Sequence, residues 1–225
     1  MTDFDEVRSA REIGERALIL GFILSAFRLR GQEEQPYAPL IVAAKPSLLP
    51  NDEELLNRGY WSDAVQGDLL WQTECLHVLL YAIEKRAEVP PVDQEVDASA
   101  LVEEINAMAR DVEGWMGSAR LRPRADLDLL NEQVSFWLWR VRSRPKKGRK
   151  LLSPFVKDAV SSAVERGVLR PDETSGSDAL CFGRPFFELE VEQQDLVHEI
   201  VEERCRAVFW IWKDFDDWWN PILDS

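Results

Sequence analysis

The stretch LLWQTECLHVLLYA, residues 69–82, decides the fold class. Its apolar residues cover most of the circumference of a helix rather than one face, which predicts a central helix buried on several sides. We expect this helix to extend over residues 62–87 and to end before Pro90 and Pro91, because proline cannot continue a helix. One carboxylate, Glu74, stands in its most apolar part.

On both sides of this segment, apolar residues recur at helical spacing. The expected helices cover residues 5–29, a short segment from Asn51, residues 97–115 with a stripe from Leu101 to Trp115, a segment after Pro123, residues 154–166 and residues 191–215. Strand-like signals are confined to residues 168–170 and 179–182, which flank a turn and could form a small hairpin. The sequence therefore predicts a mainly α fold, an irregular bundle of six or seven helices with a small β-hairpin near the C-terminal third.

We expect one helical domain over residues 1–225, because no repeat period or βα alternation is visible. Three segments interrupt the helices. They are a proline-rich loop or arm at residues 32–50, a basic linker at residues 143–153 and a hairpin-like insertion at residues 168–189.

Composition narrows the class of protein. The 225 residues include 27 Lys and Arg against 41 Asp and Glu, for a net charge of -14, which argues against nucleic acid or an anionic membrane as the main partner. Three distant cysteines predict neither a disulfide framework nor a structural zinc site. The apolar run at residues 17–27 is too short to cross a membrane, and an acidic lead-in is not typical of a secretory signal. We therefore expect a cytoplasmic protein.

Arg204 lies in the apolar stripe of the last helix, between Ile200 and Ala207. A buried guanidinium group is costly unless a carboxylate pairs with it, and Glu74 is the natural partner. We favour an internal Glu74–Arg204 ion pair that orients two helices. The alternative is a polar pocket in which the two residues recognise a ligand or a peptide end.

The two histidines occur in similar frames, with Glu74 three residues before His77 and Asp195 three residues before His198. Such frames build di-iron centres in ferritin-like bundles, so a metal-dependent enzyme is an alternative interpretation. The competing interpretation is that both histidines are ordinary helix residues. No nucleophile elbow or glycine-rich phosphate loop is present, so the sequence favours a protein that is not an enzyme and predicts no cofactor.

A basic cluster at residues 140–150 contains seven Arg or Lys residues. It could contact the phosphates of a nucleic acid, which is a third interpretation. We favour a solvated connector, because residues 172–225 hold fourteen acidic residues against four basic ones and can balance the cluster within the molecule.

The C-terminus is rich in tryptophan, with Trp210, Trp212, Trp218 and Trp219 among three aspartates. These side chains either pack under the last helix or form a patch for a protein partner or for self-association. Together with the acidic composition, they lead us to expect a non-catalytic protein-interaction module, which could neutralise a basic partner.

Two stretches resemble a bacterial family, the domain of unknown function 4272. The first is residues 71–82, with Trp71 and Glu74, followed by Pro90 and Pro91; the second is residues 202–210 together with residues 214–218, and the turn at 182–186 lies between them. The resemblance extends over most of the chain from about Arg8. The chain departs from the family pattern at Gln72, at Phe209 and in its order of Asp and Trp. The resemblance implies a mainly helical fold and no particular activity.

Overall fold

The computed structural model describes residues 6–28, 48–49, 51–53, 63–144 and 154–219. The predicted fold class is confirmed, because the chain is mainly helical and has one small antiparallel hairpin in its C-terminal part. The α-helices are α1 (Ala10–Arg28), α4 (Asp63–Ala82), α5 (Ala98–Arg110), α6 (Val112–Gly117), α7 (Arg124–Arg142), α8 (Pro154–Glu165) and α9 (Val191–Ile211).

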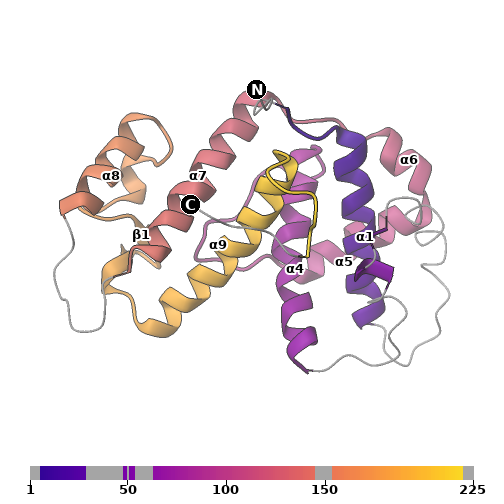
Figure 1. Ribbon diagram of the computed structural model, residues 1–225, viewed down its shortest axis with the longest axis horizontal. Coiled ribbons are helices and arrows are strands. Elements are labelled where there is room, and N and C mark those ends of the chain that lie inside the picture. Colours follow the sequence, from indigo (N-terminus) through magenta and orange to yellow (C-terminus); the bar gives the residue numbers. More distant parts are fainter. Residues whose placement is uncertain (1–5, 29–47, 50, 54–62, 145–153, 220–225) are drawn as a thin grey trace.

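The helices α7, α9, α4 and α1 lie side by side in that order, with α8 beyond α7 at one end and α6 at the other (Figure 1). In this row α4 lies between α9 and α1 and contacts both. Its apolar side chains are therefore buried on several sides, and Cys75, Leu76, Val78, Leu79 and Leu80 are all 0% exposed. The prediction of a central helix is confirmed.

The apolar stripe that was expected to form one helix over residues 97–115 is divided between α5 and α6. Asp111 separates them with an extended φ of -152°, and its side chain accepts a hydrogen bond of 2.9 Å from the backbone N–H of Gly114. An Asp that binds the backbone in this way starts a new helix instead of continuing the old one. The apolar spacing alone does not reveal this break.

The hairpin pairs β1 (Leu180–Cys181) with β2 (Arg184–Pro185). The prediction that residues 168–170 pair with residues 179–182 is wrong. Phe182 and Gly183 both have positive φ values, 52° and 69°, as a two-residue hairpin turn of the I′ kind requires. The expected turn instead contains a short 3₁₀ helix, Pro171–Glu173, which Glu173 closes by accepting the N–H of Arg170 at 2.7 Å.

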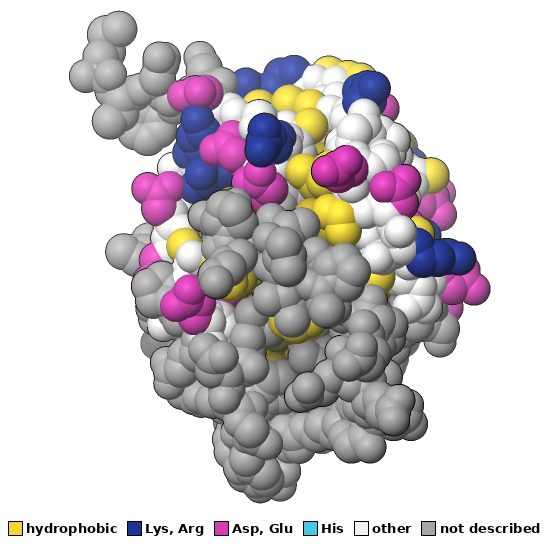
Figure 2. All heavy atoms as spheres, turned by 90° about the vertical axis from the view of Figure 1, so that its right-hand side faces the viewer, with side chains coloured by type: hydrophobic (Ala, Val, Ile, Leu, Met, Phe, Trp, Pro, Cys, Tyr) yellow, Lys and Arg dark blue, Asp and Glu magenta, His cyan; other side chains and the backbone are white. Residues whose placement is uncertain are grey.

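Most of the predicted arm at residues 32–50 and most of the linker at residues 143–153 lie outside the described residues. In the described part, no helix is long and apolar enough to cross a membrane. The face formed by α1 and α6 carries hydrophobic side chains among charged ones (Figure 2). A depression of about 510 Å³ lies there and includes Leu18 and Met116 in its lining.

Candidate functional site

Glu74 of α4 and Arg204 of α9 form the ion pair that the sequence predicts. Arg204 Nε donates to Glu74 Oε2 at 2.8 Å, and each residue is 1% exposed. Burial lowers the pKa of Arg204, and the Glu74 carboxylate opposes this shift. The pair joins the two helices that contact each other in the centre of the row.

The remaining polar atoms of the pair bind the segment after α4. Glu74 Oε1 accepts the N–H of Val96 at 2.7 Å. Arg204 Nη1 donates to the Pro90 carbonyl at 2.5 Å, and Nη2 donates to the Gln94 carbonyl at 2.9 Å. The pair therefore fixes residues 90–96 against α9 in addition to orienting two helices, and this segment was not foreseen as part of its surroundings.

Arg204 also borders a groove of about 680 Å³, within the size range of ligand sites. Four further parts of the chain contribute to its lining: residues 88–94, α7, residues 168–173 and the hairpin. The apolar side chains of the lining include Leu130, Val134, Trp137, Val168, Leu169 and Leu180. We call this feature the acidic groove, for the charges described next.

The charges of the acidic groove are mostly negative. Four carboxylates line it, and Arg170 is the basic lining residue besides the buried Arg204; the four are Glu88, Asp93, Asp172 and Glu173. Arg170 lies 3.6 Å from Asp172 and 3.1 Å from Glu173. The groove thus presents an apolar lining together with excess negative charge, which suits a ligand that has both apolar and cationic groups.

Sequence reasoning identified Arg204 in this groove but none of the four carboxylates. Glu88 and Asp93 follow α4, whereas Asp172 and Glu173 follow α8, so their proximity depends on the tertiary structure. Their local sequence resembles that of any solvated turn. The sequence around the four carboxylates therefore does not indicate that they line a common groove.

The four residues that were expected to form a di-iron centre, if the protein were a metal-dependent enzyme, each bind a different partner. His77 Nε2 bonds the Glu88 carbonyl at 2.9 Å, His198 Nε2 bonds Glu202 Oε1 at 2.9 Å, and Asp195 pairs with Arg144. Glu74 forms its ion pair with Arg204. Throughout the described ranges, no group of three or more His, Cys, Asp or Glu side chains could hold a metal ion.

The tryptophans of the C-terminus are mostly inside the molecule. Trp218 is 0% exposed and Trp210 is 7% exposed, and their rings pack edge to face with centroids 5.5 Å apart. The Trp218 indole N–H donates to Gln72 Oε1 at 2.9 Å. A surface patch that includes Trp218 is therefore wrong, because the indole fills the core; Trp71 and Trp219 are half-buried.

Three arginines of the basic cluster lie in the described part, and all three pair with acidic residues from the C-terminal third. Arg140 is 0% exposed and forms two bonds of 2.6 Å to Asp178. Arg142 lies 3.5 Å from Glu202, and Arg144 pairs with Asp195. The expected internal balance of charge is present for these three. The burial of Arg140 was not foreseen.

The described part of the chain is mainly helical, contains an acidic groove and holds no metal-ligand cluster. The model of a family described as a domain of unknown function, DUF4272, matches residues 2–166. The chain belongs to this family. The match includes Glu74 but ends before the hairpin and α9, so Arg204 lies outside it. No curated protein and no solved structure matches the chain.

Proposed function

We propose that this protein is a non-catalytic interaction module that binds a basic segment of a partner protein in the acidic groove. The observation that carries the proposal is the combination of an apolar lining with four carboxylates in a groove of about 680 Å³. A segment that alternates Lys or Arg with apolar residues matches both features. Its cationic groups would meet the carboxylates, and its apolar side chains would meet Leu180 and Trp137.

The charge of the whole chain supports the same partner. A net charge of -14 attracts a cationic chain over distances beyond direct contact and raises its association rate at low salt. The described arginines of the basic cluster are paired within the molecule, which favours a protein partner over a nucleic acid.

The hydrogen bonds at the border of the groove support binding without a large rearrangement. One wall, residues 90–96, is held by the buried Glu74–Arg204 pair. A second hydrogen bond joins this wall to the turn of the hairpin, because Asp93 Oδ2 accepts the N–H of Phe182 at 2.5 Å. A preformed groove loses less conformational entropy on binding than a mobile one.

The test uses a fluorescein-labelled octapeptide of alternating Lys and Leu, titrated with the full chain while fluorescence anisotropy is recorded. We expect saturable binding that weakens steeply as salt rises. Glu88→Lys combined with Asp172→Lys reverses two exposed groove charges, and we expect it to weaken binding about tenfold or more, which is about 1.4 kcal/mol.

The matched control is Glu103→Lys combined with Glu113→Lys. These exposed residues lie on α5 and α6, so the net charge changes equally but away from the groove. We expect the control to change the affinity by less than about threefold. Equal weakening in both variants would show that the groove is not the site, and so would equal binding of a Glu-Leu octapeptide.

A further inference from the structure

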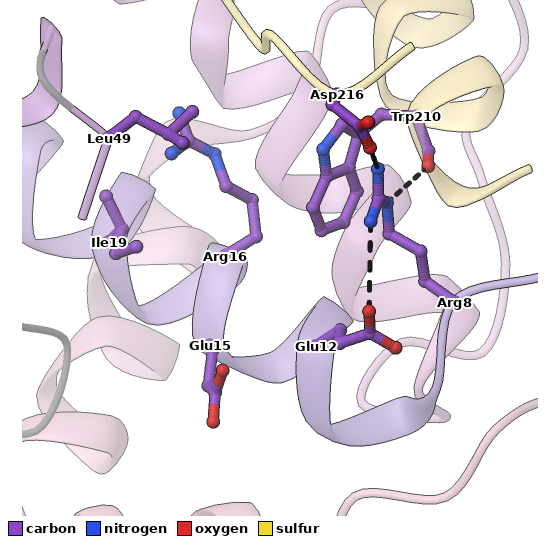
Figure 3. Close-up of a pocket in the computed structure, with 8 residues that line it drawn as sticks. All are labelled: Arg8, Glu12, Glu15, Arg16, Ile19, Leu49, Trp210 and Asp216. Atoms are coloured by element: carbon purple, nitrogen blue, oxygen red, sulfur yellow. Dashed lines mark hydrogen bonds and ion pairs between the residues drawn. The ribbon is translucent and has the colours of Figure 1, made fainter. Parts of the chain in front are cut away.

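A second cavity, of about 300 Å³, lies beside the first half of α1. It shares no lining residue with the acidic groove. Figure 3 shows its lining side chains, which come from α1, from the short segment at Leu49, from Trp210 of α9 and from the chain on either side of these helices. We call it the Arg16 cavity, after the buried cation in its wall.

Arg16 is 3% exposed, and its guanidinium group is only partly satisfied. Nη1 donates to Asp52 Oδ2 at 2.7 Å, and the group stacks on Trp218 with its carbon 4.6 Å from the ring centroid. Nε and Nη2 are buried and have no hydrogen-bond partner among the described residues. Buried donors without partners destabilise a fold, so such a group calls for an explanation.

Asp52 does not pair with Nε or Nη2, and both of its oxygens accept other donors. Oδ2 also accepts the N–H of Leu49 at 2.8 Å, and Oδ1 accepts the indole N–H of Trp219 at 2.8 Å. Burial is the largest influence on the pKa of Arg16 and lowers it, against the opposing effect of Asp52. One carboxylate therefore does not replace the hydration that this cation loses.

The second arginine of the cavity, Arg8, has hydrogen-bond partners for Nε and Nη2, and its Nη1 lies 3.8 Å from Glu12. Arg8 Nη2 donates to Asp216 at 2.7 Å, and its Nε donates to the Trp210 carbonyl at 2.8 Å (Figure 3). The Arg8 group also stacks on the Trp210 ring at 4.3 Å. Among the described lining residues, Arg16 is the one whose buried nitrogens lack a hydrogen-bond partner.

Nε and Nη2 lie on the same edge of a guanidinium group, and this edge makes two parallel bonds to a carboxylate. Glu12, Glu15 and Asp216 also line the cavity, and they would repel a dianion such as phosphate more strongly than a monoanion. Ile19 and Leu49 add apolar surface on the side of Arg16, and Trp210 adds apolar surface beside Arg8 (Figure 3). Together these features favour a monocarboxylate with an apolar tail.

We propose that the Arg16 cavity binds a small monocarboxylic acid with an apolar tail, whose carboxylate accepts hydrogen bonds from Nε and Nη2 of Arg16 and whose tail contacts Ile19, Leu49 and Trp210. The site is independent of the proposed peptide groove. The carboxylate of the ligand supplies the hydrogen-bond acceptors that Nε and Nη2 of Arg16 lack within the described part of the protein.

The test titrates the full chain with benzoate, with inorganic phosphate and with the uncharged analogue benzyl alcohol, and follows heat by calorimetry and the Nε–H resonances of arginine by NMR. We expect saturable benzoate binding with a dissociation constant of about 1 mM or lower. We expect binding of phosphate and benzyl alcohol to be at least about tenfold weaker. One arginine Nε–H resonance should shift with benzoate and be missing from Arg16→Lys.

Two variants distinguish the site from general charge effects. Arg16→Lys keeps the charge that faces Asp52 but removes the two-donor edge, and we expect benzoate affinity to fall about tenfold or more. Leu49→Trp fills the cavity without changing Arg16, and we expect it to remove binding. If Arg16→Lys does not fold, Leu49→Trp decides the question. Unchanged benzoate affinity in a folded variant, or no benzoate binding to the native chain, would overturn the proposal.

Discussion

Buried arginines dominate the structure at the scale of single residues. Arg16, Arg140 and Arg204 are each at most 3% exposed, and each faces a buried carboxylate. Their remaining donors differ: Arg204 binds backbone carbonyls, whereas Arg16 has two unpartnered nitrogens in the described part of the chain. The same residue type therefore acts as a structural clamp in one place and, in another, keeps donors without partners among the described residues.

Loss of one partner of the central pair should destabilise the protein strongly. We expect Arg204→Ala to lower the free energy of unfolding by about 3–5 kcal/mol, because the buried Glu74 carboxylate would be left without its cation. Urea unfolding followed by circular dichroism measures this change. The control is Arg166→Ala, which breaks an exposed pair with Glu132 and should cost less than about 1 kcal/mol. Similar values for the two variants would contradict the structural role.

Sequence reasoning found Arg204 and Glu74 because each interrupts an apolar helical stripe, where a charge must find a partner. Arg16 interrupts the stripe of α1 in the same way, between Ile13 and Ala17, and this signal could have identified it. Asp178 gave no such signal, because it lies in a polar turn that the hairpin draws into the core beside Arg140.

At the scale of elements, apolar spacing predicted the main helices, but the breaks between them depend on local backbone chemistry. Asp111 divides α5 from α6 by capping the backbone, and the positive φ values at Phe182 and Gly183 decide which residues form the hairpin. Both devices act through one or two residues, so a pattern averaged over a helix or strand does not detect them.

The hairpin turn should be sensitive to substitution at Gly183. Its φ of +69° is a region that side chains with a Cβ rarely adopt, although a Cβ there would meet no atom within 4 Å. We expect Gly183→Ala to lower the free energy of unfolding by about 1 kcal/mol through backbone strain alone. Gly117 is a matched control, since a Cβ there also meets nothing within 4 Å and its φ is not positive. Gly117→Ala should leave stability unchanged or raise it, and an equal loss in both variants would refute the strain argument.

The contact between α4 and the following segment should depend on pH. Burial lowers the pKa of His77, which bonds the Glu88 carbonyl as a neutral ring. Because the pKa of His77 is lower in the folded chain than in the unfolded chain, the unfolded chain takes up the proton first as pH falls. His77 therefore stabilises the folded chain above the usual histidine pKa of about 6.5, and this stabilisation is lost as pH falls below it.

We therefore expect the native chain to lose more stability than His77→Gln between about pH 7.5 and about pH 5. Thermal unfolding at several pH values measures the difference between the two proteins. The glutamine amide can still donate to the Glu88 carbonyl but does not titrate. Parallel pH profiles for both proteins would show that His77 is not linked to folding.

At the scale of the whole molecule, charge is distributed unevenly between the interior and the surface. The buried arginines are balanced inside, and the groove at the end of α4 keeps four carboxylates along an apolar lining. Net charge could be read from composition, but the groove could not, because it forms only when α7, the hairpin and residues 88–94 come together. Part of the negative charge that the composition shows is therefore located on one defined surface, the acidic groove.

Binding in the acidic groove is tested by an NMR map of the Lys-Leu octapeptide on the full chain. We expect shifts at residues 88–94, at residues 168–173 and at the indole N–H of Trp137, which Trp137→Phe assigns. We also expect Glu88→Lys combined with Asp172→Lys to remove these shifts. Shifts confined to the face formed by α1 and α6, or shifts that persist in the charge-reversed variant, would show that the peptide does not bind in the acidic groove.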